Sequence, residues 1–547
     1  MALHELQGII AEALRHHQAG RMVEAEQLYR RVLAEDSRHA DALHLLGLIA
    51  RKTGRKTEAV ELIGQAIAID GAVAVYHYNM GNALRDVGRV DAAIAAYGAA
   101  IHLKPDYAKA YHNLAQGLKG AGRLAEAVAA YRAALRLEPE DDEAYFLLGN
   151  TLFDLRRFPE AAHAFRAALC VRPDHAEAQS NLGNTRRKMG SLDAAIPAYE
   201  RAIRLRPAYA EAYYNRGVAL HELGELAAAI GSYRQALLHK PDLPAAHYNL
   251  GNSLLLAGRF QEGWPEHEWR LPWRASVGIG TLRAFARPQW TGQEVLGRVI
   301  LLHAELGLGD SLFFSRYVPL VVALGAKVVL EVQPPLLGLL APLRGLVELV
   351  GQGDPLPDFD FHCPLMSLPL AFGTTAETIP PPLPGIAPAM APPDRGAFRI
   401  GLAWEGSPRH GDPHRSLPIS GIVAALGRVP GVRLVSLQKE HGPEGLARLP
   451  AGAIEIVPLD SFTDTAALMM GLDLVVAIDC VVAHLAGTLG RPLWVPLQKV
   501  AFWPWGVAGD RTPWYPTARL FRQTARGDWG DVFHRLEEAA GCLRSSA

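Results

Sequence analysis

A period of 34 residues runs through the first half of the chain and constrains its fold more than any other feature. A small residue and two alanines return at this interval, and in most units an aromatic residue and a proline return with them. The recurring positions are Gly47, Gly81, Ala115, Gly149, Gly183, Gly217 and Gly251; Ala59 to Ala229; Ala66 to Ala236; Tyr97, Tyr131, Phe165, Tyr199 and Tyr233; and Pro105, Pro139, Pro173, Pro207 and Pro241. A period of this length indicates a stack of helix pairs.

The residue types explain how such pairs pack. Small residues let the first helix of a unit approach the second closely, and the aromatic residue fills the space between neighbouring units. Proline ends the second helix because it lacks an N–H group and clashes with the preceding turn. The pattern resembles the tetratricopeptide repeat. We predict about eight units over residues 6–273, with a diverged first unit as a cap, folding as a superhelix without the rest of the chain.

Asparagines recur on the first helix of the units, which lines the concave face of such a superhelix. A ladder of amides can hydrogen-bond the backbone of an extended peptide without reading its sequence. Alternatively, the same amides satisfy local backbone groups between helices. We favour binding of a peptide or protein, with these residues as its contacts: Asn79, Asn113, Asn181, Asn215 and Asn249.

Composition narrows the remaining functions. The 55 basic and 56 acidic residues nearly cancel, which gives no support for nucleic acid or an acidic membrane surface as a partner. The cysteines (Cys170, Cys363, Cys480 and Cys542) form no CxxC pair, which argues against a zinc site or a disulfide framework. The N-terminus lacks an apolar signal core, and no uninterrupted apolar run is long enough to span a membrane. We therefore expect a cytoplasmic protein.

The second half alternates apolar strands with helices, which predicts parallel α/β sheets. Strands are expected at 298–304, 327–332, 398–404, 432–437 and 472–478, with a helix from Leu312 to about Leu324. The expected divisions are a linker over 274–297, a first Rossmann-like lobe over 298–378, a proline-rich connector over 379–397 and a second lobe over 398–547.

Ligands of such sheets lie beyond the carboxyl ends of the strands. Asp479 and His484 follow a buried strand, although an Asp that caps a helix and a His that packs on it would look the same. The cationic loop ending at Arg415 follows another strand, and its guanidinium groups suit a diphosphate. Asp358 and Asp360 superficially suggest a metal site, but their alternation with Phe359 and Phe361 fits an edge strand better.

Four short motifs carry a resemblance to heptosyltransferase-like glycosyltransferases (family 9): Gly307-Leu-Gly-Asp310, Arg415-Ser-Leu-Pro418, Ser436-Leu-Gln-Lys439 and Ile478-Asp479-x-x-x-Ala-His484-Leu-Ala-Gly487. The resemblance covers the chain from about residue 298 and implies a GT-B fold, two Rossmann-like lobes with the active site in the cleft between them. It also implies an inverting, metal-independent transfer from a nucleotide-diphosphate sugar, with no cofactor. Asp310 matches the family's general base. The donor-binding residues implied are Gly309, Arg415, Ser416, Gln438, Lys439, Asp479, Cys480, Val481 and His484.

Two functions follow from this sequence. The chain is predicted to glycosylate a protein or glycan acceptor recruited by the repeats. The alternative is a non-catalytic interaction scaffold with a degenerate transferase region, favoured by Cys480, which stands where related sequences carry threonine, and by an atypical loop after Val495. An O-GlcNAc-transferase-like enzyme shares the layout, but the motifs fit family 9 better.

Overall fold

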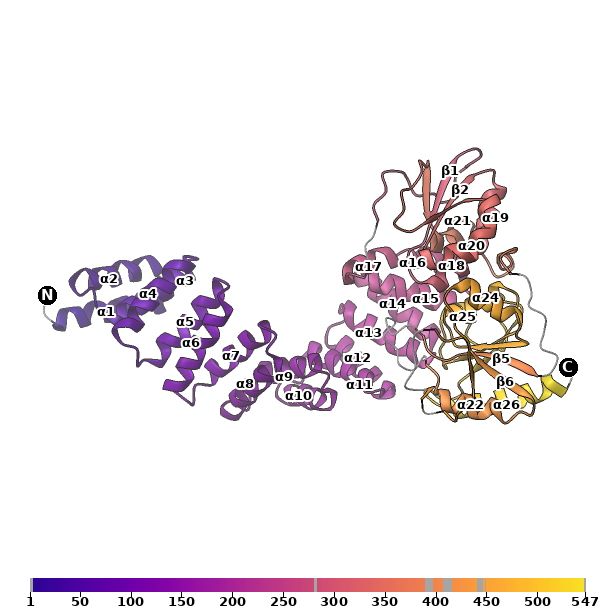
Figure 1. Cartoon of the computed structure of the whole chain (residues 1–547). Helices are drawn as coiled ribbons and strands as arrows, with labels where there is room; N and C mark the ends of the chain where they lie inside the picture. The colour runs from indigo at the N-terminus through magenta and orange to yellow at the C-terminus, as the bar shows by residue number, and fades with distance from the viewer. Residues whose placement is uncertain are drawn as a thin grey trace. The chain divides into compact units, whose positions relative to one another are not determined.

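The computed structural model describes residues 3–279, 283–388, 397–406, 416–439, 446–447 and 449–545. The chain forms two compact units, Met1–Arg216 and Gly217–Ala547, and the division falls inside one helix, α13 (Ala210–Leu223). The first unit is wholly helical, whereas the second holds the last helices of the repeat array together with both β-sheets (Figure 1).

The first unit consists of antiparallel helix pairs, as the 34-residue period predicts. The helices are α1 (Leu3–Gln18), α2 (Met22–Glu35), α3 (Ala40–Lys52), α4 (Lys56–Ile69), α5 (Ala74–Asp86), α6 (Val90–Leu103), α7 (Ala108–Gly120), α8 (Leu124–Leu137), α9 (Asp142–Asp154), α10 (Phe158–Val171), α11 (Ala176–Lys188) and α12 (Leu192–Leu205). In each pair the odd-numbered helix packs on the even-numbered helix that follows it.

The glycines and aromatic residues of the period pack against each other. A Cβ atom on Gly81 would lie 2.5 Å from the ring of Tyr97, and one on Gly183 would lie 2.6 Å from the ring of Tyr199. Both distances are far inside van der Waals contact, so the helices can only approach this closely at glycine. The prediction that small residues admit the aromatic ring is confirmed.

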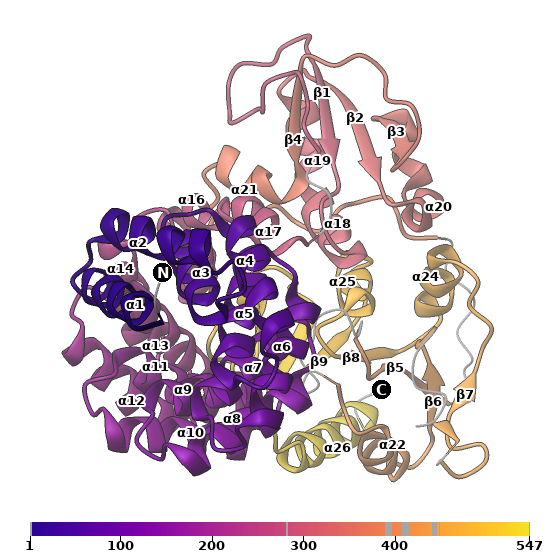
Figure 2. The same ribbon diagram turned by 90° about the vertical axis from the view of Figure 1, so that its left-hand side faces the viewer.

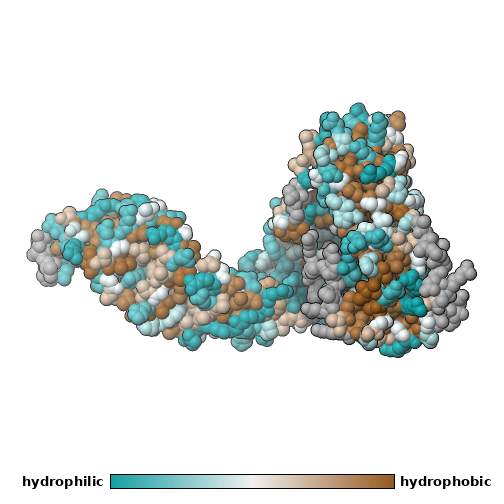
Figure 3. All heavy atoms as spheres, in the orientation of Figure 1, coloured by the Kyte–Doolittle hydropathy of each residue, from teal (hydrophilic) through white to brown (hydrophobic). Residues whose placement is uncertain are grey.

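The surface of the repeats mixes hydrophilic and hydrophobic residues in the view of Figure 3. Part of the apolar exposure is periodic, because the last residues of α6, α8, α10 and α12 are each 39–40% exposed: Leu103, Leu137, Val171 and Leu205. These apolar side chains recur once per repeat.

The second unit begins with the end of the array. Its helices are α14 (Leu226–His239), α15 (Pro244–Leu256), the short α16 (Phe260–His267) and α17 (Arg270–Val277). The expected boundary at residue 273 therefore falls inside α17. The helix ends instead at Gly278, whose φ of +68° suits glycine.

Two parallel sheets follow. The first has the order β3-β2-β1-β4 and comprises β1 (Val299–His303), β2 (Lys327–Val332), β3 (Glu348–Gly351) and β4 (Phe361–Pro364). The second has the order β10-β9-β8-β5-β6-β7 and comprises β5 (Phe398–Ala403), β6 (Val432–Ser436), β7 (Glu455–Ile456), β8 (Leu474–Ala477), β9 (Leu493–Leu497) and β10 (Ala518–Arg522).

Both sheets share one topology. Counting strands from β5, the second sheet has the doubly wound order 3-2-1-4-5-6, and the first sheet has its opening part, 3-2-1-4. In each sheet the chain reverses its direction of winding after the first strand, and ligands of such sheets bind at that switch point. The α/β fold expected for residues 298–547 is confirmed, and Figure 2 shows the two sheets separately.

Most helices beside the strands are short, and α26 is the long exception. They are α18 (Leu308–Phe314), η1 (Ser315–Tyr317), α19 (Val318–Ala323), η2 (Pro334–Leu336), α20 (Leu337–Leu340), η3 (Ala341–Gly345), η4 (Leu365–Ser367), α21 (Leu368–Ala371), α22 (Ile419–Gly427), α24 (Phe462–Met470), α25 (Val481–Thr488), η7 (Trp503–Trp505) and α26 (Gly530–Ser545). The single helix expected from Leu312 to Leu324 is wrong: helical structure begins at Leu308 and changes to a 3-10 turn before Pro319, because proline cannot donate an α-helical hydrogen bond.

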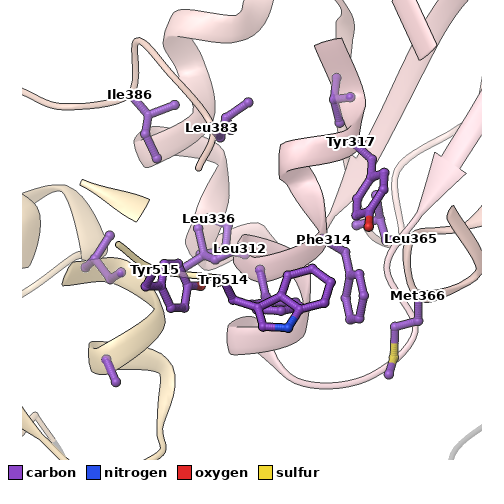
Figure 4. Close-up of a cluster of buried hydrophobic side chains, with 14 of the residues drawn as sticks. Leu312, Phe314, Tyr317, Leu336, Leu365, Met366, Leu383, Ile386, Trp514 and Tyr515 are labelled. Carbon is purple, nitrogen blue, oxygen red and sulfur yellow. The ribbon is translucent and has the colours of Figure 1, made fainter. Parts of the chain in front are cut away.

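One hydrophobic core joins the lobes. Leu312 and Tyr317 of the first lobe and Trp514 and Tyr515 of the second belong to it (Figure 4). Leu383, 2% exposed, comes from the segment expected to be a stiff connector. Leu383 and Ile386 therefore anchor the described part of that connector in the core between the lobes.

Candidate functional site

Asp310 lies in the first turn of α18, just beyond the carboxyl end of β1. Its Oδ2 accepts a hydrogen bond of 2.9 Å from the backbone N–H of Gly307, the N-cap residue. The carboxylate is half-buried. A carboxylate at a helix N-terminus is favoured by the helix dipole, so Asp310 stabilises this turn whatever its chemistry.

The start of α18 touches the start of α25 from the other lobe. A Cβ atom on Gly309 would lie 3.0 Å from Cδ2 of His484 and 3.5 Å from the Cα of Val481. A side chain at this position would be tightly packed against His484, and Figures 1 and 2 show the two helices side by side. Two sequence motifs some 170 residues apart are brought together here. Gly309 and Val481, expected to bind the donor, form this contact.

Asp479, His484 and Tyr515 form a polar group at the switch point of the second sheet. The strand β8 is fixed to β5 by a bond from Ile478 N to Ala403 O, and Asp479 follows directly. His484 Nε2 lies 3.7 Å from Asp479 Oδ1, and its Nδ1 lies 3.1 Å from the hydroxyl of Tyr515. Both ring nitrogens of His484 therefore face groups that can fix its orientation and tautomer.

His484 is buried among aromatic side chains. Its ring stacks on Trp505 with centroids 5.7 Å apart, Phe313 meets it edge-on at 5.4 Å, and the residue is 7% exposed. Burial raises the pKa of Tyr515, so its hydroxyl stays protonated. Cys480 is the N-cap of α25, and an α-helix leaves its first N–H groups without intrahelical acceptors, where they can bind an anion.

Gln438 clamps the loop after β5. Its Oε1 accepts from the backbone N–H groups of Trp404 and Glu405 at 3.3 and 3.2 Å, and its Nε2 donates to the carbonyl of Glu405 at 3.2 Å. Gln438 is the residue that the motif assigned to the donor, and these three bonds fix the orientation of its amide. Its role in the described residues is to shape the loop beyond β5.

The first lobe contains the same clamp. Gln333, directly after β2, donates through Nε2 to the carbonyl of Leu306 at 2.9 Å, and its Oε1 accepts from Ser311 Oγ at 2.8 Å. In both sheets a glutamine after the second strand thus holds the loop after the first. Nothing in the local sequence marked Gln333; the strand topology reveals it.

Two further predicted residues lie near the same edge of the second sheet. Lys439 donates through Nζ to the carbonyl of Asp460 at 2.8 Å. Ser416 precedes Leu417, whose N–H donates to Trp404 O at 2.8 Å, so it is held beside the end of β5. Arg415 lies outside the described residues.

Side chains of α17 occupy the switch point of the first sheet. Arg270 of α17 is 1% exposed, and its Nε and Nη2 donate to the two carboxylate oxygens of Glu305 at 2.9 and 2.8 Å. Nη2 also donates to Ser367 at 2.7 Å, and Nη1 pairs with Glu268 at 2.5 Å. Arg274, one turn later, donates to the carbonyl of Glu305. The last helix of the array is therefore fastened beyond β1.

This helix also brings an aromatic residue of the array towards Asp310. Tyr248 of α15 stacks on Trp273 of α17 with centroids 4.7 Å apart. Burial raises the pKa of Tyr248, and the negative charge of Asp310 raises it further. The final repeat thus reaches the surroundings of the candidate base.

A buried arginine fastens the two lobes to each other. Arg316 is 2% exposed, and its Nη1 donates to the carbonyls of Trp514 at 2.8 Å and Pro380 at 3.4 Å. Its guanidinium carbon lies 4.5 and 4.8 Å from the ring centroids of Phe313 and Tyr515. These contacts hold Tyr515 against His484. The aromatic loops around residues 503 and 515 were visible in the sequence, but their partner Arg316 was not.

The asparagines of the concave face bond mainly to neighbouring side chains. Asn79 Nδ2 lies 2.9 Å from His44 Nε2, Asn113 Nδ2 donates to Asn82 at 2.9 Å, and Asn181 Nδ2 donates to Asn150 at 2.8 Å. These bonds join successive repeats, so Asn79, Asn113 and Asn181 each have a side-chain partner on a neighbouring repeat. Asn215 and Asn249 occupy the equivalent places on α13 and α15.

Among the described residues, no group of three or more His, Cys, Asp and Glu side chains is arranged to hold a metal ion. Asp360 Oδ2 instead accepts from the backbone N–H of Val299 at 2.8 Å, and β4 is an edge strand. Asp358 and Asp360 precede β4 and do not lie in it, so the expected edge strand begins only at Phe361.

Comparisons with known proteins identify the first half. Residues 81–120, 183–224 and 219–258 match the family described as TPR repeat, and residues 16–78 and 112–180 match two families described as tetratricopeptide repeat. These helix pairs are tetratricopeptide repeats. Tetratricopeptide repeats are typical of scaffolds for protein interaction.

Individual relatives resemble parts of the chain. Protein FlbA of Caulobacter vibrioides is 27% identical over 333 residues, covering 52% of this chain and 53% of FlbA, so the chain spans about half the length of that relative. The MamA structure is 26% identical over 31% of this chain and 93% of its own, with a TM-score of 0.30. YrrB, described as a TPR protein with an unusual peptide-binding site, is 25% identical over 34% and 96%, with a TM-score of 0.32.

Within the described residues, no helix has both the length and the apolar character needed to cross a bilayer.

Proposed function

We propose that residues 298–547 form an inverting glycosyltransferase that needs no metal and uses a nucleotide-diphosphate sugar. The acceptor is a protein or glycan recruited by the tetratricopeptide repeats. The observation that carries the proposal is the meeting of α18 and α25, which places Asp310 and the Asp479–His484 turn on two touching helix starts. If this region served only for packing, motifs from two separate lobes would have no reason to meet there.

Each part of this group has a chemical role in the proposed reaction. The N-terminus of α25, beyond the switch point of the second sheet, suits the diphosphate of a donor. Asp310 takes the proton from an acceptor hydroxyl as that oxygen attacks the anomeric carbon, and the diphosphate leaves from the opposite face. A positioned carboxylate base contributes about 10²–10⁴ in rate.

The buried aromatic shell supports the same role. Phe313 and Trp505 enclose His484, and water-poor surroundings strengthen its electrostatic contacts with Asp479 and with a bound phosphate. The arrangement resembles the two-lobed GT-B layout, in which the two sheets face a shared ligand.

The alternative function is a scaffold without chemistry. Two observations support it. Arg270 and Gln438 make structural contacts with the loops at the switch points, and Cys480 stands at the helix start where related sequences usually have a hydroxyl. The two functions differ in whether nucleotide sugars bind and turn over.

Asp310→Asn decides between them, because asparagine can still accept the Gly307 hydrogen bond but cannot take a proton. Nucleotide sugars are first screened by thermal shift on the full chain. Release of nucleoside diphosphate, and transfer of labelled sugar to acceptor candidates, are then measured for each hit. We expect transfer by Asp310→Asn to fall at least a hundredfold with donor binding unchanged.

Asp354→Asn is the matched control. Asp354 lies in the same lobe and accepts a comparable bond from the backbone N–H of Gly351 at 3.2 Å. It should retain full activity. Undiminished transfer by Asp310→Asn would reject Asp310 as the base, and a chain that binds no nucleotide sugar would establish the scaffold.

A further inference from the structure

A cavity of about 370 Å³ lies where the turn between α13 and α14 meets the loop after β9. This volume is in the range of small-ligand pockets. Its walls come from the last repeats and from the second α/β lobe: Leu223, Gly224, Leu226, Leu256, Lys499, Val500, Ala501, Val507, Ala508, Arg522 and Gln523. It is separate from the group around Asp479, and neither the repeats nor the proposed transfer reaction accounts for it.

The charge of the lining has one sign. Lys499 and Arg522 are cationic, and none of the described lining residues carries a carboxylate. Arg522 Nε donates to the carbonyl of Gly509 at 3.3 Å and its Nη2 to the carbonyl of Trp505, so both partners are neutral. Partial burial lowers the pKa of Arg522 to about 10, which leaves it charged at neutral pH.

Two adjacent residues of the lining have hydrogen-bond donors that lack acceptors. Arg522 Nη1 and Gln523 Nε2 are both buried without a partner in the described residues. Gln523 is only 4% exposed, and its Oε1 is held by the backbone N–H of Gly527 at 3.0 Å, which fixes the amide. Because buried polar groups are normally hydrogen-bonded, this pair of donors calls for an oxygen acceptor.

The rest of the lining is aliphatic. Leu223, Leu226 and Leu256 contribute from the repeats, and Val500 and Val507 contribute from the lobe. Val507 is 52% exposed, so the cavity opens to solvent at its rim. The lining residues that the structure describes include no aromatic side chain, which disfavours a nucleotide base and leaves hydrocarbon as the matching ligand surface.

We propose that this cavity binds an apolar anion, a carboxylate or phosphate headgroup on a short hydrocarbon body. The headgroup lies against Arg522, Gln523 and Lys499, and the hydrocarbon contacts the leucines and valines. A bound anion would also be connected to the candidate site, since Arg522 bonds to the carbonyl of Trp505 and the ring of Trp505 stacks on His484.

The test uses three probes with the same tail: octyl phosphate, octanoate and octanol. Each is titrated into the full chain by calorimetry below its critical micelle concentration. We expect one of the two anions to bind and octanol to bind at least tenfold more weakly. Tighter binding of octyl phosphate identifies a phosphate site, and tighter binding of octanoate identifies a carboxylate site.

Variants assign the binding to the cavity. Arg522→Gln should weaken the anion about tenfold to a hundredfold, the scale of a hydrogen bond to a charged group. Arg522 also bonds to the carbonyl of Trp505, so substitutions at two exposed lining residues are used to support the assignment. Lys499→Gln should weaken anion binding severalfold, and Ala508→Trp should abolish anion binding by filling the cavity. Arg519→Gln, on the same strand but outside the lining, is the control and should bind as the parent does.

Equal binding of octanol and the anions, or no binding of any probe, would overturn the proposal. So would unchanged affinity in both Lys499→Gln and Ala508→Trp. Neither outcome depends on glycosyl transfer, so this site and the proposed enzyme stand or fall separately.

Discussion

The two α/β lobes are built on the same plan and treat their switch points differently. Each has the strand order 3-2-1-4 and a glutamine after its second strand, Gln333 or Gln438, that clamps the loop after the first. In the first lobe the region beyond β1 receives Arg270 from the last helix of the array. In the second lobe the region beyond β5 and β8 carries Asp479 and His484.

One architecture thus serves two purposes. The edge of a parallel sheet offers helix N-termini and loop groups that can accept either a ligand or another part of the protein. Here the first lobe uses much of that edge to fasten the repeats, and the second keeps a polar group there. The Asp310 turn lies beside both, since α18 follows β1 and touches α25.

The largest expected effect comes from breaking the fastening in the first lobe. Arg270→Met leaves Glu305, with a side chain 4% exposed, without its cation, and unpaired buried charges of this kind cost about 3–5 kcal/mol. Chemical denaturation of the full chain should show this loss in the transition that reports on the sheets.

Arg298→Gln tests whether burial is the cause. Arg298 pairs with Asp360 in the same lobe at 3.6 Å, but its side chain is 62% exposed, so its loss should cost less than about 1 kcal/mol. Similar losses in the two variants would mean that the buried ion pair is not the feature that distinguishes this switch point.

The pH dependence of stability should also differ between the two lobes. His303, the last residue of β1, is buried beside His362 and Arg283, and burial lowers its pKa to about 3, whereas Ala403 ends β5. In the unfolded chain His303 takes up a proton near pH 6.5, whereas in the folded chain it stays neutral until the pH approaches 3. The stabilisation is therefore complete above pH 6.5 and is lost as the pH falls towards 3, by about 3 kcal/mol at pH 4.5.

Comparison of the parent with His303→Gln isolates this contribution from the general effect of acid. Their difference in unfolding free energy should change between pH 7 and pH 4.5. His534→Gln, which removes a histidine with a side chain 71% exposed, should show no such change. A parallel pH profile for parent and His303→Gln would contradict the prediction.

Substitution of Arg415 tests whether the second lobe binds the donor. We expect Arg415→Ala to weaken nucleoside-diphosphate binding by about 1.5–3 kcal/mol, the scale of a charge-assisted contact. Calorimetry with the matched nucleoside diphosphate measures it, and Arg344→Ala in the first lobe is the control. Equal affinity in the parent and Arg415→Ala would remove the cationic loop from the donor site.

The two clamps should give the smallest effect and should give it equally. Gln333→Leu and Gln438→Leu each remove hydrogen bonds to a loop, and we expect each to cost about 1 kcal/mol. If Gln438 also binds the donor, as its motif suggested, Gln438→Leu will lower nucleotide affinity by more than Gln333→Leu does. Thermal unfolding and calorimetry on the two variants measure both quantities.

The sequence predicted features that depend on local patterns. The period predicted the helix pairs, and apolar runs predicted β1, β2, β5, β6 and β8 to within about one or two residues at most ends. The short strands β3 and β7 were missed, since four and two residues carry too little alternation to be recognised. Proline at 319 was a visible signal for the helix break that the expected single helix ignored.

Side-chain partners were harder to predict because they depend on long-range packing. Asp479 and His484 were placed together because they share one turn. Arg270 and Glu305 are 35 residues apart, and Arg316 meets Trp514 across 198 residues. Polar residues such as Gln438 look alike in a sequence whether they bind a ligand or a loop, and only the structure shows which atoms they contact.

The glycine–aromatic contact has a consequence for how the array can change length. Gly81, Gly149, Gly183 and Gly217 each pack on the aromatic ring 16 positions later, within their own 34-residue units. Unequal recombination that adds or removes one whole unit between α5 and α12 would therefore leave every such contact paired. Copy number can thus drift in a lineage, while the last units, held by Trp264 and Arg270, are kept as a fixed terminus.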